Sequence, residues 1–136
     1  MTKNIDLKKY AQFVDGVTAQ PSKELQALIS RMQELEAQGA NVPRLLTAGI
    51  GMPGESGEFS ELVKKIVFHG KAYDEENITK LKKELGDVAW YWTQACLALD
   101  IDPNSIIAEN VAKLEARYPG GKFSVWHAEN RQEGDV

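Results

Sequence analysis

Two pairs of acidic residues recur at the same spacing in the middle of the chain. Glu55 and Glu58 lie three residues apart, and Glu84 and Asp87 repeat that interval. Side chains three residues apart project from one side of a helix, so two neighbouring helices could bring all four carboxylates into one small volume. Mg²⁺ takes carboxylate oxygens as protein ligands and is usually completed by waters and substrate phosphates. The spacing therefore predicts a divalent-cation site and phosphate chemistry.

A helical projection places these acids beside apolar side chains. At roughly 100° per residue, Glu55 projects about 30° from the centre of one apolar stripe, which puts it near the core, while Glu84 and Asp87 lie on the flank of a second stripe. A carboxylate at an apolar seam costs on the order of several kcal/mol unless it is paired or binds a cation. The first stripe comprises Met52, Phe59, Leu62, Val63 and Ile66, and the second comprises Ile78, Leu81, Leu85, Val88, Trp92, Ala95 and Leu99.

The same acids could instead form an ordinary solvated face. Lys64, Lys80 and Lys83 lie on the same predicted helices as possible ion-pair partners, and charged helix positions usually contact water. Glu61, three residues after Glu58, could add a further cation ligand or could simply face solvent. Spacing alone leaves both interpretations open.

Length and composition predict one soluble globular domain over residues 1–136. The chain has a mass of 15.1 kDa, is 43% apolar and 26% charged, and carries a net charge of −4, which argues against a general nucleic-acid partner. The N-terminus lacks the apolar run of a signal peptide and no stretch reaches the length of a membrane span, so we expect a cytoplasmic protein without a membrane partner. The one cysteine, Cys96, lies in an apolar stretch, where we expect it to be buried, and it cannot form an intramolecular disulfide.

The hydrophobic periodicity is helical nearly throughout and predicts an all-α bundle of about five helices. Ser22, Asp74 and Asp102 are of the residue types that cap helix N-termini. The predicted helices cover about residues 6–17, 23–38, 43–68, 75–99 and 103–117.

Two segments depart from this regular pattern. Three glycines and Pro53 fall within residues 49–54 and predict a break or kink immediately before Glu55. From about Lys122 onward the periodicity is lost, so the tail is predicted to be irregular.

The acidic pairs and the spacer between them resemble the MazG-like family of all-α nucleoside triphosphate pyrophosphohydrolases. Twenty-five residues separate Glu58 from Glu84, and the similarity covers roughly residues 45–131. The resemblance implies that Glu55, Glu58, Glu84 and Asp87 are catalytic and hold two or more Mg²⁺ ions, with Mn²⁺ able to substitute. Gly54 departs from the family, which usually has a further Glu there, and this puts the support of the ligands in doubt.

Further segments resemble short phage and bacterial members of the family. The resemblance implies substrate-binding roles for seven residues, although His69 could instead act as a helix cap and Tyr91 could simply pack. These residues are His69, Lys71, Tyr91, Asn110, Lys113, Arg117 and Tyr118. The segments are Phe68-His-Gly-Lys71, Asp87-Val-Ala-Trp-Tyr91, Asn110-x-x-Lys113-Leu-x-x-Arg117-Tyr118-Pro119 and the tail pair Asn130-Arg131.

The residues of the Asn110 segment agree with that assignment on their own spacing. Asn110, Lys113 and Arg117 share one helix face and present an amide, an ammonium and a guanidinium group. Such a face suits a polyphosphate, because Arg can hold two oxygens and Lys supplies a point charge. The alternative is a solvated helix edge on which Arg117 pairs with Glu115 or another neighbour.

The resemblance implies a Mg²⁺-dependent hydrolase that converts a (d)NTP, with (d)GTP as the specific guess, to the (d)NMP and pyrophosphate. Alternatives are a dUTPase-like or phosphoribosyl-ATP pyrophosphohydrolase of the same superfamily, or a non-enzymatic helical assembly module. Apolar residues surround the fourth predicted helix and the start of the fifth and exceed what one small bundle covers. They are Trp90, Trp92, Leu97, Leu99, Ile101, Ile106 and Ile107. We therefore expect a homo-oligomer, a tetramer built as a dimer of dimers. The resemblance further implies that residues of one subunit complete the site of another, and that Asn130-Arg131 in the tail reaches across. If the gene is from a phage, the protein would act in the host cytoplasm.

Overall fold

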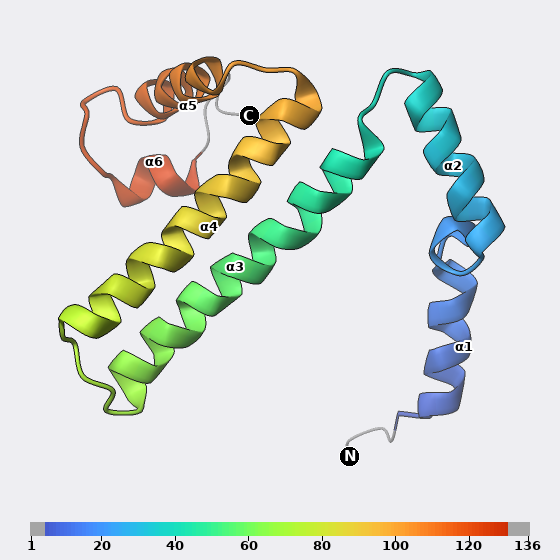
Figure 1. Cartoon of the computed structure of the whole chain (residues 1–136), viewed down its shortest axis with the longest axis horizontal. Coiled ribbons are helices and arrows are strands. Elements are labelled where there is room, and N and C mark those ends of the chain that lie inside the picture. The colour runs from blue at the N-terminus through green and yellow to red at the C-terminus, as the bar shows by residue number, and fades with distance from the viewer. Residues whose placement is uncertain (1–4, 131–136) are drawn as a thin grey trace. The chain divides into compact units, whose positions relative to one another are not determined.

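The computed structural model describes residues 5–130, which contain helices and no strand (Figure 1). The chain divides into two compact units between Val42 and Pro43. The prediction of an all-α fold with about five helices is confirmed, since five helices have eleven or more residues. The elements are α1 (Leu7–Val17), the 3₁₀ helix η1 (Gln20–Ser22), α2 (Leu25–Ala37), α3 (Val42–Phe68), α4 (Glu75–Leu99), α5 (Pro103–Arg117) and α6 (Val125–Glu129).

The start of α2 differs from the prediction that Ser22 is its N-cap. Ser22 instead ends η1, and its backbone N–H donates to the Ala19 carbonyl at 3.0 Å. Pro21 explains the difference, because its fixed φ favours a tight turn at this point. The residue before α2 is Glu24, whose side chain makes no capping hydrogen bond.

Aspartates cap the two helices for which they were predicted. The Asp74 carboxylate accepts a hydrogen bond from the Asn77 backbone N–H at 2.9 Å, and the Asp102 carboxylate accepts one from the Asn104 N–H at 3.0 Å. These bonds satisfy N–H groups that have no partner within the first turn of a helix. The predicted starts of α4 and α5 are therefore confirmed.

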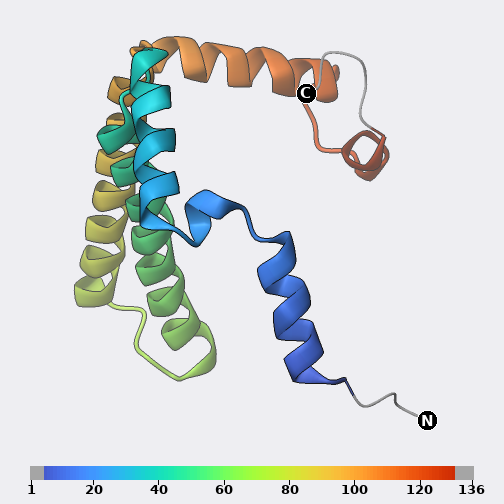
Figure 2. The same cartoon turned by 90° about the vertical axis from the view of Figure 1, so that its right-hand side faces the viewer.

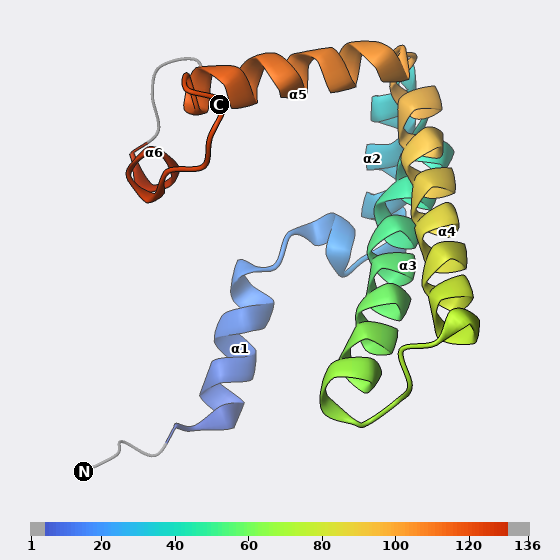
Figure 3. The ribbon, with the colours of Figure 1, turned by 90° about the vertical axis from the view of Figure 1, so that its left-hand side faces the viewer.

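A break or kink was predicted within residues 49–54. The break is wrong, because α3 continues without interruption from Val42 to Phe68 with Pro53 inside it, and the kink stays a prediction. Pro53 has no N–H to offer the Gly49 carbonyl, so the helix lacks one of its regular bonds at this point. Helices α3 and α4 lie side by side and antiparallel in all three views (Figure 1, Figure 3). Packing along this pair outweighs the low helix propensity of three glycines and one proline.

Residues 69–74 join α3 to α4, and Gly70 adopts a positive φ of 70° in this turn. The apolar side chains buried in the described part of the chain are few and small. Cys96 is 2% exposed, as expected from its apolar stretch, and Val42 and Ala48 are also buried. The α3–α4 hairpin is therefore held by a thin apolar contact.

The C-terminal part of the second unit continues from the end of α4. Helix α5 leads away from the α3–α4 pair (Figure 2), and α6 follows after a turn. The tail beyond Lys122 was predicted to be irregular, which is wrong for Val125–Glu129, because the Ser124 hydroxyl caps this short helix by accepting from the His127 N–H. The predicted contact residue Arg131 lies outside the described residues. Within residues 5–130, no helix is both long and apolar enough to cross a membrane.

Candidate metal site

The α3–α4 hairpin brings the two acidic pairs to the same height. Glu58 lies about 15 Å before the end of α3 at Phe68, and Glu84 lies about 14 Å after the start of α4 at Glu75. Because the helices run antiparallel from one short turn, residues at equal distances from that turn face one another. The matching spacing in the sequence thus becomes a juxtaposition in space.

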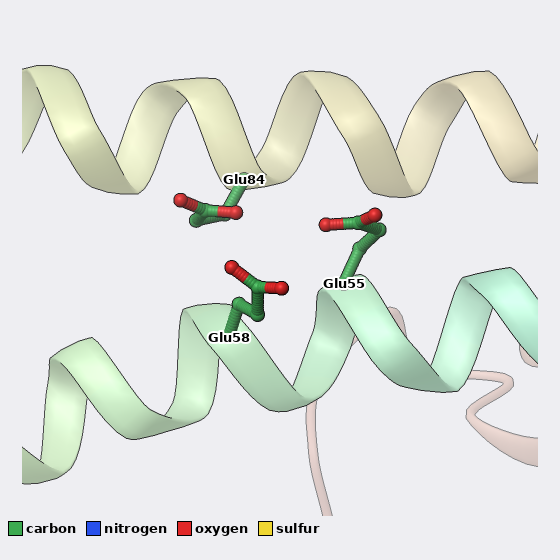
Figure 4. A group of neighbouring side chains, drawn as sticks. All are labelled: Glu55, Glu58 and Glu84. Carbon is green, nitrogen blue, oxygen red and sulfur yellow. The ribbon is translucent and has the colours of Figure 1, made fainter.

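Three of the four predicted ligands meet between the helices. Each of Glu55, Glu58 and Glu84 offers a carboxylate oxygen, and these oxygens lie within 4.8 Å of one another. Figure 4 shows Glu55 and Glu58 pointing from α3 toward Glu84 on α4. Oxygen ligands lie about 2.0–2.6 Å from Mg²⁺ or Ca²⁺, so oxygens about 4–5 Å apart can share one cation. The residue types and their separation both fit a hard divalent cation.

The electrostatics of the cluster agree with this geometry. Partial burial raises the pKa of Glu55, and the negative charges of Glu58, Asp87 and Glu84 raise it further. Asp87 therefore lies close enough to act on Glu55, although it is not one of the three carboxylates that meet. Glu55 was expected near the core and is half-buried, as is Glu84, whereas Glu58 and Asp87 are exposed. A bound cation would reverse the repulsion among these groups.

The neighbouring lysines form ion pairs with other acids. Lys64 pairs with Glu61, which also lies 3.3 Å from the Lys65 ammonium, and Lys80 pairs with Glu76. Hydrogen bonds from Lys64 and Lys65 lower the pKa of Glu61. Two of the three lysines that could have neutralised the acid cluster are thus engaged elsewhere.

Tyr91 packs beside the acid cluster, against the glycine that precedes Glu55 by one helical turn. A Cβ atom placed on Gly51 would lie 1.9 Å from Cε1 of the Tyr91 ring, so only glycine leaves room for this ring. Tyr91 also contacts Trp90 edge to face, with ring centroids 4.8 Å apart, and lines a hollow with Leu46, Thr47, Ile50 and Gly51. The contact places the ring against α3 about one helical turn from Glu55.

His69 and Lys71 lie in the turn that closes the hairpin. Their backbone N–H groups both donate to the Lys65 carbonyl at 3.1 Å and so complete the end of α3. His69 is exposed and Lys71 is half-buried. Their predicted contacts with substrate stay predictions.

The other predicted substrate-binding residues lie on or next to α5. Asn110, Lys113 and Arg117 belong to this helix, which leads away from the pair that carries the acids (Figure 2). Tyr118 follows it and lines a hollow of about 300 Å³ with Val111, Leu114, Glu115, Gly121, Lys122 and Phe123. The structure thus groups these residues with one another, and their role toward the substrate stays a prediction.

Sequence reasoning considered Lys80 only as an ion-pair partner of the acids and gave Lys65 no role at the site. Both line a hollow of about 350 Å³ together with Glu58 and Glu84. Their spacing was a usable signal, because Lys80 precedes Glu84 by one helical turn and Lys65 follows Glu58 by two.

Comparison with known proteins gives two matches. The MazG nucleotide pyrophosphohydrolase domain matches residues 46–121, which contain all four acids. The chain is also similar to the Gene 37 protein of Mycobacterium phage L5, with 37% identity over 73 residues. That alignment covers 53% of this chain and 64% of the phage protein. No solved structure matches the chain.

Proposed function

Because the chain belongs to the MazG nucleotide pyrophosphohydrolase family, we propose that it hydrolyses a nucleoside or deoxynucleoside triphosphate to the monophosphate and pyrophosphate. The observation that carries this proposal is the convergence of Glu55, Glu58 and Glu84 from two helices within 4.8 Å. Such a cluster suits a substrate that arrives with a divalent cation on its phosphates.

Glu55, Glu58, Glu84 and Asp87 would hold two or more Mg²⁺ ions, or Mn²⁺ in their place. When bound, the cations neutralise phosphate charge and lower the pKa of water. The carboxylate of Glu58 or Glu55 accepts a proton from the attacking water as the water oxygen bonds to phosphorus and a phosphoanhydride bond breaks. The half-buried position of Glu55 limits access of bulk water to this side of the cluster.

The face formed by Asn110, Lys113 and Arg117 would bind the polyphosphate. Because α5 leads away from its own α3–α4 pair, we propose that this face serves the acid cluster of a second copy of the chain. Tyr118 would add a contact from the same face. His69 and Lys71 in the turn, together with Tyr91 on α4, would contact the nucleotide from the copy that carries the acids.

For the base we propose guanine, in GTP or dGTP, and for the location the cytoplasm, where such substrates occur. Hydrolysis of a nucleotide panel, with separation of the products, tests the base. Preference for dUTP or phosphoribosyl-ATP would assign the chain to another activity of the same superfamily. The phage relative's name, Gene 37 protein, gives no activity for comparison.

The proposal is tested by metal binding and by product analysis. A cation at a concentration 100 times its dissociation constant stabilises the native state by about 2.7 kcal/mol, so Mg²⁺ or Mn²⁺ should raise the thermal midpoint. Monophosphate and pyrophosphate should then form in equal amounts. A chain that neither gains stability from these cations nor hydrolyses any triphosphate would instead be a helical assembly module.

A further inference from the structure

Helix α1 is amphipathic and exposed along its whole length. At roughly 100° per residue, its apolar side chains fall within one arc of about 160°, and the other residues fill the rest of the circle. The apolar side chains are Leu7, Tyr10, Ala11, Phe13, Val14 and Val17, and the others are Lys8, Lys9, Gln12, Asp15 and Gly16. Leu7 is 74% exposed, Phe13 is 65% exposed, and every other residue of α1 is exposed as well. Within residues 5–130 this apolar face therefore has no cover.

Such a helix needs a partner surface. A helix of eleven residues is only marginally stable alone in water, and most helical stability in proteins comes from the packing of an apolar face. Residues 1–4 and 131–136, outside the described range, contain only Met1 and Val136 as apolar residues. They do not supply a matching apolar surface, which points to another molecule as the partner.

The centre of the apolar face matches a second copy of itself in the antiparallel direction. Its four residues follow the alternating three- and four-residue spacing of coiled-coil seams, and they are Leu7, Tyr10, Val14 and Val17. Because the set is symmetric about position 12, an antiparallel copy places Leu7 opposite Val17 and Tyr10 opposite Val14. Each contact then joins a larger side chain to a smaller one, which fills the space between the helices. In a parallel copy, Tyr10 would meet Tyr10 and Val14 would meet Val14.

The polar side of α1 argues against a membrane as the partner. Helices that lie on membranes typically carry a polar face rich in lysine and arginine, which binds anionic lipids. In α1 the charges of Lys8 and Lys9 are balanced by Asp15 within the helix and by Asp6 at its N-cap. The absence of a basic excess on α1 favours a protein surface, and the symmetric seam favours a second copy of this chain.

We propose that α1 packs antiparallel against α1 of a second copy and thereby joins two dimers into the predicted tetramer. A covered Tyr or Phe side chain buries about 150–250 Å², so the rings of Tyr10 and Phe13 in two copies supply several hundred Å². A stable interface needs about 1,200–2,000 Å². The α1 pair is therefore too small to hold two chains alone, and it adds to contacts of exposed apolar residues such as Trp90 and Ile107. This inference goes beyond the proposed function, because α1 lies outside the matched residues 46–121.

Cysteine pairs test the antiparallel register in the full-length chain. Mild oxidation of Leu7→Cys/Val17→Cys should link two chains, because a disulfide needs Cα atoms within about 7 Å and these positions face each other only between copies. Within one helix they lie about 15 Å apart, so no link forms inside a chain. Lys8→Cys/Gly16→Cys is the matched control, since this pair has the same register on the polar side. Cys96 is buried and stays in every variant.

Non-reducing electrophoresis should show linked chains for Leu7→Cys/Val17→Cys and none for the polar-side control. The single variant Leu7→Cys should also form no link, because its two copies would lie at opposite ends of the antiparallel pair. Links in this single variant would reveal a parallel order and overturn the inference. Absence of links in Leu7→Cys/Val17→Cys overturns it too.

A charge in the seam tests the assembly independently of the cross-links. Val14→Asp should lower the mass measured by light scattering about twofold, from tetramer to dimer, while Gln12→Asp on the polar side should leave it unchanged. An unchanged mass for Val14→Asp, or a monomeric wild type, overturns the inference. Flotation of the wild type, but not of Val14→Asp, with vesicles of phosphatidylcholine and phosphatidylserine would assign the face to a membrane and overturn it as well.

Discussion

At the scale of single residues, the acid cluster is a set of like charges that the fold holds together. Glu55, Glu58 and Glu84 approach within 4.8 Å, and their repulsion, together with partial burial, raises the pKa of Glu55. Such an arrangement does not stabilise a protein without a counter-charge. A bound cation would supply this counter-charge.

Conservative substitution of each acid should separate catalysis from folding. Glu55→Gln, Glu58→Gln, Glu84→Gln and Asp87→Asn should each lower kcat/KM by about two orders of magnitude or more, because each removes a charge that, in the proposed site, would hold the cation. Circular dichroism should show unchanged helix content. The control is Glu109→Gln, an exposed acid on α5. Two variants with near-full activity would contradict the assignment.

The raised pKa of Glu55 predicts how the metal-free protein responds to pH. The pKa of Glu55 is higher in the folded protein than its ordinary value of 4.5. The contribution of such an acid to the free energy of unfolding is fully present below pH 4.5 and is lost as pH rises through the raised pKa. The thermal midpoint of the metal-free wild type should therefore fall, relative to Glu55→Gln, as pH rises above 4.5. Scanning fluorimetry across this range measures the difference.

The lowered pKa of Glu61 makes stability rise with pH, which is opposite to the effect of Glu55. Because Glu61 is present in both the wild type and Glu55→Gln, the comparison of the two cancels its contribution. Saturating Mg²⁺ should remove the difference at neutral pH, because the cation binds the ionised carboxylates. A wild type that gains stability over Glu55→Gln as pH rises without metal would point to a structural ion pair instead.

At the scale of helices, the sequence predicted the elements where local chemistry determines them. Asp74 and Asp102 cap the helices they were predicted to cap, because a carboxylate next to free N–H groups acts locally. The break expected around Pro53 is absent. The continuity of α3 there depends on its packing against α4, which local helix propensity does not describe. The acid pairs were predictable for the same reason as the caps, since an interval of three fixes a helix face. The spacing of Lys65 and Lys80 from the acids could also be read from the sequence, but their meeting in one hollow depends on the antiparallel pairing of α3 and α4.

Because Tyr91 packs against Gly51, the stability of the protein should be sensitive to alanine at Gly51 and should tolerate alanine at Gly49. Gly51→Ala places a Cβ atom 1.9 Å from the Tyr91 ring, and the displacement should cost about 1–3 kcal/mol. Gly49→Ala meets nothing within 4 Å and should stabilise the helix by about 0.5–1 kcal/mol. Urea denaturation measures both changes. Equal effects at the two positions would show that the ring is not seated on Gly51 in solution.

At the scale of the whole molecule, large apolar side chains are exposed on each of the five long helices. Trp90 is 53% exposed, Leu97 and Ile107 are each 56% exposed, and Leu99 and Ile101 are exposed as well. These five belong to the set expected from sequence to exceed what one bundle covers, while Trp92 and Ile106 are half-buried. Exposed apolar surface on this scale is typical of protein interfaces. It supports the prediction of a homo-oligomer, which sequence patterns alone cannot resolve into dimer or tetramer.

Light scattering at micromolar concentration should give a mass at least twice 15.1 kDa. The predicted association would bury the exposed apolar residues of α4 and α5, so Trp90→Glu and Ile107→Glu should lower the mass or reduce solubility. If the face on α5 serves the site of a second copy, activity should fall on dilution below the dissociation constant. A monomer with full activity would show that each chain holds a complete site.

The equal distance of both acidic pairs from one short turn limits how chain length can vary around the site. A residue inserted in the turn at 69–74 leaves both helices, and therefore the four carboxylates, in register. A residue inserted between Glu75 and Glu84 would instead rotate Glu84 by about 100° and shift it by about 1.5 Å. An insertion of about seven residues in α3, matched by one of about seven residues in α4, would restore both the direction and the height of the acidic side chains relative to one another. Length differences among related chains should accordingly fall in the turn or occur as such pairs.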